Sequence, residues 1–370
     1  MPAPLLSLSR RLRRTPLTER VEAAGVRAYT VYNHMLLPTV FESLEADCAH
    51  LKRHVQLWDV ACQRQVEVTG PDARHLLQLC TPRDLASLDY GQCRYAPLVA
   101  ADGGMLNDPV ILQVGADRYW VSIADHDIRL WMEGIAVGRG LDVRVTEPAV
   151  YPLAIQGPKA ETLVMRVFGE AAQAIRFFRY ERLAFGGRSL IVARSGYSKQ
   201  DGFEVYVDDP ALAEPLWDRL MEAGRDLEVR AGGPNLIERI EGGLLSYGND
   251  ITREHTPYEV GSGSVCRLDT DPPCLAADAL RPEAEQGSGR HVRGLRIKGG
   301  AVAACRESWP VTAAGEPVGS VTSAVWSPER STNVAIGTLA RAHAVAGTTV
   351  TVHAPDGARA ATVCALPHSA

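Results

Sequence analysis

The sequence predicts an α+β protein in which two related halves with antiparallel sheets precede a small C-terminal β-barrel. An internal repeat carries the prediction of two halves, because residues 66–77 resemble residues 153–164. Each copy has a short apolar strand, a Gly that ends it and a Pro suited to the first position of a helix. Each copy then continues into an apolar strand with an aromatic residue, Tyr95 or Tyr180.

A turn rich in Gly and Asp closes each repeat. The turns lie at 102–108 and 196–202, and apolar segments typical of strands follow at 109–114 and 203–207. Two α+β halves are the simplest interpretation of this duplication. We expect a ligand to bind in a cleft between two such halves.

The last part of the chain has a different pattern. Short alternating segments broken by Gly predict a small barrel or sandwich, and they lie at 294–297, 318–324, 334–338 and 348–353. A polar, Gly-rich stretch at about 279–293 is typical of a linker. We therefore expect a region at 1–285, with halves at about 15–150 and 151–285, and a barrel domain at 290–370.

Two segments have the apolar spacing of amphipathic helices. One runs from 38 to 51 and the other from 235 to 245, where Glu238 and Arg239 lie between apolar positions.

Composition restricts the functional class. Apolar residues are 46% of the chain, charged residues are 22% and the net charge is −5, which is typical of a globular protein and argues against nucleic acid or an anionic membrane as a partner. The basic start at 7–14 lacks the apolar core of a secretory signal, so we interpret it as a surface arm. We expect a small-molecule ligand and a monomer or homodimer.

The eight cysteines form no C-x-x-C pair and most lie in apolar surroundings. This usage indicates buried thiols in a reducing compartment, so we expect a cytoplasmic protein. The ten histidines are scattered without a metal-binding motif. We expect no metal.

The segment 194–204 is the most informative for function. It places Gly196 and Gly202 around Tyr197 and then enters a strand with Glu204. A tyrosine face and a carboxylate suit a flat heteroaromatic ligand with N–H groups at its edge. A tight hairpin with a solvated rim is the structural alternative.

Several motifs together resemble the folate-dependent aminomethyltransferase family of the glycine cleavage system. The pterin-binding loop is similar to 196–204, and the catalytic turn is similar to 103–108. Residues 244–250 and 257–261 resemble the segment after the family's binding arginine. Residues 319–323 resemble its C-terminal barrel motif.

Within the family, the dimethylsulfoniopropionate demethylase branch is the most similar. The segments 29–38, 58–66, 194–200 and 332–337 resemble that branch and not the glycine-cleavage enzymes. The resemblance implies a three-domain fold and a tetrahydrofolate cosubstrate. It also implies methyl transfer from a small sulfonium zwitterion to N5 of tetrahydrofolate, which yields 5-methyltetrahydrofolate and a thioether.

Two other functions stay open at this point. The first is aminomethyltransferase-like one-carbon transfer from another donor, such as an amine or a methoxy compound. The second is a non-catalytic folate-binding protein of the same fold. Residues 269–280 depart from the family pattern, which leaves the identity of the methyl donor open.

The resemblance also assigns site residues. Asp108 matches the catalytic aspartate, and we expect it to contact the folate near the reacting nitrogen and to assist departure of the proton; the structural alternative is a turn cap before Pro109. The full set of expected folate-binding residues is Tyr95, Asp108, Phe178, Tyr197, Glu204, Arg239 and Tyr247. Arg239 suits the carboxylates of the folate tail, although a surface ion pair with Glu238 or Glu241 is an equally good interpretation.

A dimethylsulfonium group is bulky and cationic, so aromatic faces should bind it. The candidates for this contact are Tyr29, Tyr32, Trp120, Phe178 and Tyr206, with core packing as the alternative for Trp120 and Phe178. Tyr32 and His34 lie in the branch-specific motif and are expected on the substrate side. Gln63 could bind the substrate carboxylate or the pterin, and Tyr206 is the fourth expected substrate-binding residue.

Asn107 stands where the family has the first of two paired acids. The site therefore carries one negative charge fewer beside a cationic substrate. This replacement suggests a site adapted for alignment of the reactants more than for acid–base chemistry.

Overall fold

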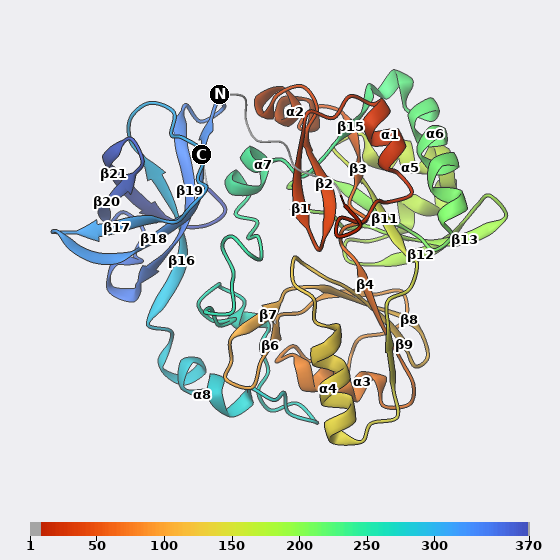
Figure 1. The fold of residues 1–370 in the computed structure, drawn as a ribbon, viewed down its shortest axis with the longest axis horizontal. Coiled ribbons are helices and arrows are strands. Elements are labelled where there is room, and N and C mark those ends of the chain that lie inside the picture. The colour runs from red at the N-terminus through yellow and green to blue at the C-terminus, as the bar shows by residue number, and fades with distance from the viewer. Residues whose placement is uncertain (1–8, 369–370) are drawn as a thin grey trace. The chain divides into compact units, whose positions relative to one another are not determined.

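The computed structural model describes residues 9–368, so the first two residues of the expected basic arm lie outside the described part. Figure 1 shows the elements along the chain. They divide into two compact units. One unit contains residues up to Arg64, Pro148–Gly196 and Gln200–Pro234, and the other contains Gln65–Glu147, Tyr197–Lys199 and residues from Asn235 on.

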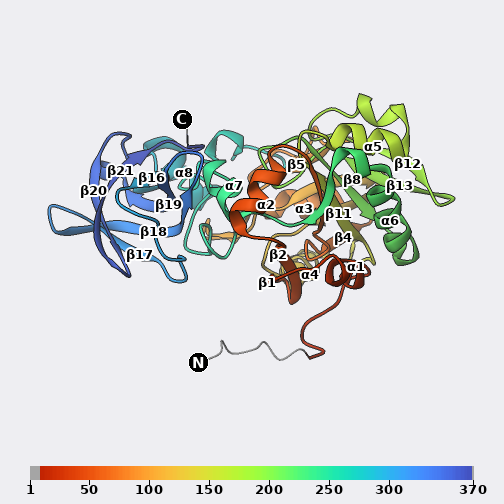
Figure 2. The ribbon, with the colours of Figure 1, turned by 90° about the horizontal axis from the view of Figure 1, so that it is seen from above.

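The first unit is built on a six-stranded sheet with the order β12-β13-β14-β11-β3-β15. The strands are β3 (Val55–Asp59), β11 (Tyr151–Gln156), β12 (Tyr180–Phe185), β13 (Arg188–Ala193), β14 (Gly202–Val207) and β15 (Val229–Gly232). All neighbours are antiparallel except β15 and β3. Helices α5 (Ala160–Phe168) and α6 (Ala213–Ala223) pack their apolar residues on this sheet. Figure 2 shows the two helices beside its strands.

A hairpin of β1 (Ala28–Tyr32) and β2 (Met35–Val40) belongs to the same unit. Asn33 and His34 form its two-residue turn with φ of 50° and 61°, as a type I′ turn requires. Helices α1 (Thr18–Ala23) and α2 (Leu44–Leu51) complete the unit. The expectation of one helix over 38–51 was wrong, because β2 occupies its first residues and Ser43 caps a shorter helix through Ala46 N.

The second unit contains a five-stranded sheet with the order β10-β4-β9-β8-β5. Its strands are β4 (Gln65–Thr69), β5 (Cys93–Tyr95), β8 (Val110–Gly115), β9 (Arg118–Ser122) and β10 (Arg144–Thr146). Helices α3 (Ala73–Cys80) and α4 (Arg129–Arg139) bury apolar residues against it. A small pair, β6 (Leu98–Val99) and β7 (Met105–Asn107), leads directly into Asp108.

The same unit ends in a closed antiparallel barrel with the order β16-β19-β18-β17-β20-β21. Its strands are β16 (Arg290–Ile297), β17 (Trp309–Ala313), β18 (Glu316–Ser327), β19 (Thr332–Ala340), β20 (Thr349–Ala354) and β21 (Gly357–Cys364). The expected barrel is confirmed. The linker expected at 279–293 was wrong, because α8 (Ala277–Gln286) and the start of β16 occupy it.

Short helical turns and one further helix connect these elements. Helix α7 (Leu236–Glu241) begins at Asn235, whose side chain accepts hydrogen bonds from Ile237 N and Glu238 N. The 3₁₀ turns are η1 (Glu170–Ala174), η2 (Pro210–Leu212), η3 (Arg225–Leu227), η4 (Gly263–Val265) and η5 (Arg341–His343). Within residues 9–368, no helix is long and apolar enough to cross a membrane.

The repeated sequence folds into the same turn twice. Gly70 and Gly157 have φ of 123° and 128°, and a Cβ on either would lie 2.4 Å or 2.3 Å from a backbone oxygen. Each glycine carbonyl also accepts a hydrogen bond from the first residue of the following helix, at 3.0 Å and 2.9 Å. The helices begin two residues after each Pro instead of at it. Only glycine permits this close approach.

Replacement of Gly157 tests the role of this turn. We expect Gly157→Ala to lower the free energy of unfolding by roughly 3–5 kcal/mol, because left-handed backbone strain and a clash with His54 O add together. Gly187→Ala is the control, since Gly187 has φ of 75° but nothing within 4 Å of the added Cβ. Urea unfolding of both variants measures the difference, and equal losses would contradict the role of the close approach.

Candidate functional site

Asp108 lies in a group of tyrosines in the second unit. It follows β7, and its Oδ2 accepts a hydrogen bond of 3.2 Å from the Tyr95 hydroxyl at the end of β5. The Asp108 charge also acts on Tyr197 and Tyr247, so both phenols lie near the carboxyl. The structure therefore brings together four of the residues expected to bind folate.

Loss of hydration dominates the electrostatics of this group. It raises the pKa of Asp108 to about 7, against the Tyr95 hydrogen bond, which lowers it. Asp108 still keeps partial contact with solvent. Burial and the Asp108 charge raise the pKa of Tyr247 to about 12, and burial also raises the pKa values of Tyr95 and Tyr197. The carboxyl can therefore exchange a proton near neutral pH while the phenols stay protonated.

The turn that carries Asp108 is fixed by the segment after α7. The Tyr247 hydroxyl donates to Met105 O at 2.9 Å, and Met105 N donates to His255 O at 2.8 Å. Arg253 pairs with Asp102 at 2.6 Å. Tyr197 is held in turn by a 2.7 Å bond from its hydroxyl to Leu245 O. These bonds leave the catalytic turn little freedom to move.

Arg239 has a partner that neither sequence-based interpretation anticipated. It is 8% exposed, and its guanidinium bonds Asp250 at 2.8 Å and the Ser323 hydroxyl at 2.7 Å. Asp250 is fully buried and also accepts bonds from Thr322 and Ser323 of β18. Arg239 is thus not in a surface pair with Glu238 or Glu241, and a folate carboxylate would share it with Asp250.

Glu204 and Phe178 belong to the first unit. Glu204 lies on β14 with 5% exposure, and burial raises its pKa while a hydrogen bond from the Ser195 hydroxyl to Oε2 opposes the rise. Oε1 makes no hydrogen bond with any described residue. Phe178 adopts a left-handed φ of 57° and its ring packs on Phe177 at 4.8 Å. A bulky residue in this conformation is strained, as is common at ligand sites.

The expected substrate-side residues are also in the first unit, but they differ in exposure. Tyr206 on β14 is 1% exposed, whereas His34 is exposed on the β1–β2 turn. Tyr32 packs against the buried cluster that contains Met35 and Trp58. Gln63 is partly buried just after β3, and its N–H donates to Val60 O at 2.9 Å. Trp120, in the other unit, is a core residue whose indole donates to Glu67 at 2.8 Å.

Two polar residues were missed at the sequence level. Asp250 forms the buried pair with Arg239 but lies beyond the end of α7 at Glu241, so no helical spacing links the two residues. Asp59 is 3% exposed on β3, bonds the Thr15 hydroxyl at 2.5 Å, and has its pKa raised to about 6 by burial. An acid directly after the apolar pair Leu57-Trp58, at the end of a strand, is the signal that could have identified Asp59.

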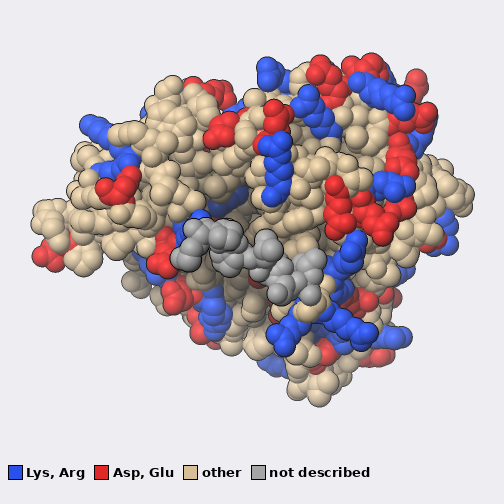
Figure 3. All heavy atoms as spheres, turned by 45° about the horizontal axis from the view of Figure 1, so that its top comes forward, with Lys and Arg blue, Asp and Glu red and all other residues tan. Residues whose placement is uncertain are grey.

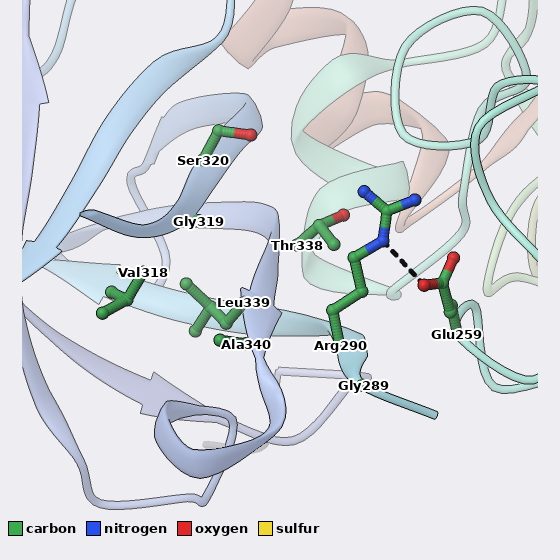
Figure 4. Close-up of a pocket in the computed structure, with 9 residues that line it drawn as sticks. All are labelled: Glu259, Gly289, Arg290, Val318, Gly319, Ser320, Thr338, Leu339 and Ala340. Carbon is green, nitrogen blue, oxygen red and sulfur yellow. Dashed lines mark hydrogen bonds and ion pairs between the residues drawn. The ribbon is translucent and has the colours of Figure 1, made fainter. Parts of the chain in front are cut away.

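The second unit also has a cavity of about 450 Å³ beside the barrel. Figure 4 shows the Arg290–Glu259 ion pair, at 2.6 Å, on one side of it. The wall opposite comes from β18 and β19, including Ser320 and Thr338. No residue expected from the sequence to bind folate or substrate lines this cavity.

Basic and acidic side chains are interspersed on the face drawn in Figure 3. Exposed ion pairs such as Arg20–Asp218, at 2.7 Å, also place opposite charges next to each other. A surface of mixed sign gives no extended field for a polyanion.

The fold consists of two mainly antiparallel sheets, each covered by helices, and a closed barrel. This combination defines the class of proteins with an aminomethyltransferase fold. A solved structure of the glycine cleavage system aminomethyltransferase T from Bartonella henselae has a TM-score of 0.86 and 25% identity, over 96% of this chain and 98% of that chain. The fold class predicted from the sequence is confirmed.

Sequence comparison agrees with the fold. Residues 17–270 match the GCVT N-terminal domain, and residues 290–369 match the glycine cleavage T-protein C-terminal barrel domain. The chain therefore belongs to the glycine cleavage T-protein family. It is 57% identical to the dimethylsulfoniopropionate demethylase DmdA of Ruegeria pomeroyi over 96% of this chain and 97% of the relative. It is 30% identical to an aminomethyltransferase of Halalkalibacterium halodurans over 96% and 98%.

Removal of the Asp250 carboxylate tests the buried pair. We expect Asp250→Ala to lower the free energy of unfolding by roughly 3–5 kcal/mol, because it leaves the Arg239 charge buried without its partner. Asp218→Ala removes an exposed pair with Arg20 and should give the small change typical of such pairs. Chemical denaturation compares the two, and a small change in both variants would contradict a structural role for Asp250.

The raised pKa of Asp108 has a consequence for stability. The unfolded carboxyl loses its proton near pH 4 and the folded one near pH 7. The folded state thus binds more protons between these values, and the free energy of unfolding contributed by Asp108 falls as pH rises through this window. We expect Asp108→Asn, compared with the unmodified protein, to gain stability progressively as pH rises from 4, up to about 4 kcal/mol above pH 7, and to differ little below pH 4.

Denaturant titrations from pH 4 to pH 8 measure this difference. A gap between the two proteins that does not change with pH would show that Asp108 has an ordinary pKa.

Proposed function

We propose that this protein is a tetrahydrofolate-dependent methyltransferase that demethylates dimethylsulfoniopropionate or a closely similar sulfonium zwitterion. The products would be 5-methyltetrahydrofolate and a thioether. The 57% identity to a dimethylsulfoniopropionate demethylase, over nearly the full length of both chains, is the observation that carries the proposal. The placement of Asp108 among tyrosines supports it independently.

Three of the expected folate-binding side chains have the chemistry that a reduced pterin requires. Glu204 is 5% exposed, and its Oε1 is not engaged by the Ser195 hydrogen bond, which goes to Oε2; a carboxylate oxygen of this kind suits the N–H edge of a pterin. Tyr95 and Tyr197 offer aromatic faces and fixed hydroxyls. Tetrahydrofolate, when bound, would supply the nucleophilic nitrogen N5.

Asp108 would accept the proton that the acceptor nitrogen releases during the reaction. The sulfonium loses its positive charge as the thioether leaves, and the acceptor nitrogen loses a proton as the methyl group is added. A carboxyl with a pKa of about 7 is half ionised at neutral pH, so it can take that proton and release it to solvent. The Tyr95 hydroxyl holds the carboxyl in one orientation and favours its ionised form.

We infer that Tyr32, His34, Gln63 and Tyr206 contribute to binding of the methyl donor. Aromatic faces would attract the sulfonium, and the amide of Gln63 can donate to the carboxylate of the zwitterion. We also propose that the protein is a monomer or homodimer in the cytoplasm. The eight free cysteines support a reducing compartment.

A donor panel tests the activity. The purified protein is incubated with tetrahydrofolate and, in separate reactions, ¹³C-methyl-labelled dimethylsulfoniopropionate, other dimethylsulfonium compounds, methylamines and a methoxy compound. We expect labelled 5-methyltetrahydrofolate from dimethylsulfoniopropionate. Transfer from amines or methoxy donors only would assign another one-carbon transfer, and transfer from no donor with folate still bound would indicate a non-catalytic binding protein.

Two substitutions separate chemistry from binding. Asp108→Asn should lower kcat by about 10²–10⁴-fold with little change in tetrahydrofolate affinity, because it removes the proton acceptor. Glu204→Gln should weaken tetrahydrofolate binding about tenfold, since the ligand loses a charged hydrogen bond. Asp218→Ala, at an exposed ion pair, is the control. Intact kcat in Asp108→Asn would remove Asp108 from the chemistry.

A further inference from the structure

Asn107 is fully buried, and every polar atom of its side chain is engaged by one loop. Its Nδ2 donates to Ala124 O at 3.2 Å and to His126 O at 2.8 Å, and its Oδ1 accepts from Ala124 N at 2.8 Å. The loop connects β9 to α4. Only an amide can donate to two carbonyl oxygens and accept from one N–H in this way.

Three consecutive residues of β7 each hold a different part of the site. Met105 O accepts from the Tyr247 hydroxyl at 2.9 Å, and Leu106 O lies 2.8 Å from His126 Nδ1. Asn107 binds the backbone of the 124–126 loop. Because Leu106 O can only accept, His126 Nδ1 must carry a proton in this hydrogen bond. Asp108 is the next residue in the chain.

The loop and the segment after α7 also meet directly. The rings of His126 and Tyr247 are stacked with centroids 5.6 Å apart and an interplanar angle of 28°. Tyr247 in turn lies close enough to Asp108 to respond to its charge. A chain of contacts thus leads from Asn107 through His126 to Tyr247, whose hydroxyl bonds Met105 O in the strand that leads into Asp108.

We propose that Asn107 is a positioning residue for methyl transfer, because its amide holds the 124–126 loop so that His126 stacks on Tyr247 beside Asp108. The inference rests on the proposed function and assigns to this site two residues that do not themselves perform the chemistry. It also explains why a neutral amide stands here. A carboxylate at 107 would face the carbonyl oxygens of Ala124 and His126 instead of donating to them, at the cost of both hydrogen bonds.

The barrel provides a matched control. Asn333 is also fully buried, and its Nδ2 donates to Ile297 O at 3.1 Å and to Gly300 O at 3.0 Å, while its Oδ1 accepts from Val302 N at 2.9 Å. It makes the same kinds of bonds as Asn107 but has no contact with the Asp108 group. Asn333→Asp therefore removes the same kinds of buried hydrogen bonds as Asn107→Asp but leaves the surroundings of Asp108 unchanged.

The test compares Asn107→Asp, Asn333→Asp and His126→Ala with the unmodified protein. We expect Asn107→Asp to lower kcat about tenfold or more at unchanged KM for tetrahydrofolate, which corresponds to about 1.4 kcal/mol in the transition state. Asn333→Asp should lose comparable stability but keep its kcat. His126→Ala retains the Asn107 hydrogen bonds and should lower kcat by a smaller factor. If Asn107→Asp fails to fold, the kcat of His126→Ala tests the positioning role by itself.

Nitrogen-15 NMR of the histidines tests the arrangement without any turnover. The unmodified protein should show His126 with its proton on Nδ1, and Asn107→Asp should lose this signature while Asn333→Asp keeps it. Equal kcat in the two Asp variants, or unchanged kcat in His126→Ala, would overturn the proposal. Retention of the Nδ1 proton in Asn107→Asp would also overturn it. No methyl transfer by the unmodified protein, with the NMR result as expected, would instead refute the proposed function alone.

Discussion

The withdrawal of one carboxyl group from water is the constraint on which the rest of the site depends. Asp108 has a pKa of about 7 because the loss of hydration raises the pKa by more than the hydrogen bond from Tyr95 lowers it. Such a group is costly to the folded state and has to be held by structure that is stable for other reasons. The catalytic turn is accordingly bonded to the segment after α7 at Met105 and Asp102.

The second unit supplies that support through buried polar contacts. The Asp250 carboxylate pairs with Arg239 of α7 and accepts a hydrogen bond from Ser323 of β18. One buried carboxylate therefore links the barrel to the segment that holds the catalytic turn. Asn107 adds a second anchor from the β9–α4 loop. Because each buried polar group is satisfied by hydrogen bonds, these contacts specify one arrangement instead of merely adding stability.

The sequence predicted those parts of the fold that depend on local pattern. The repeated strand–Gly–Pro segments gave both strand–helix turns, since Gly70 and Gly157 are each required by a close backbone contact. The barrel was predicted, although β17 and β21 were missed. Most of a helix at 277–286 was mistaken for part of a linker because the stretch is polar and glycines follow it. The partners of Arg239 and Asn107 depend on tertiary contacts, which no spacing in the chain reveals.

Direct titration of Asp108 tests the central claim of this account. Carbon-13 NMR of the protein labelled at its aspartate carboxyls, assigned with the Asp108→Asn variant, follows the carboxyl signal from pH 4 to pH 9. The desolvated environment beside Tyr95 predicts a midpoint near pH 7. A midpoint near the ordinary value of about 4 would contradict it, because Asp108 would then be a solvated turn residue with no capacity to take up a proton at neutral pH.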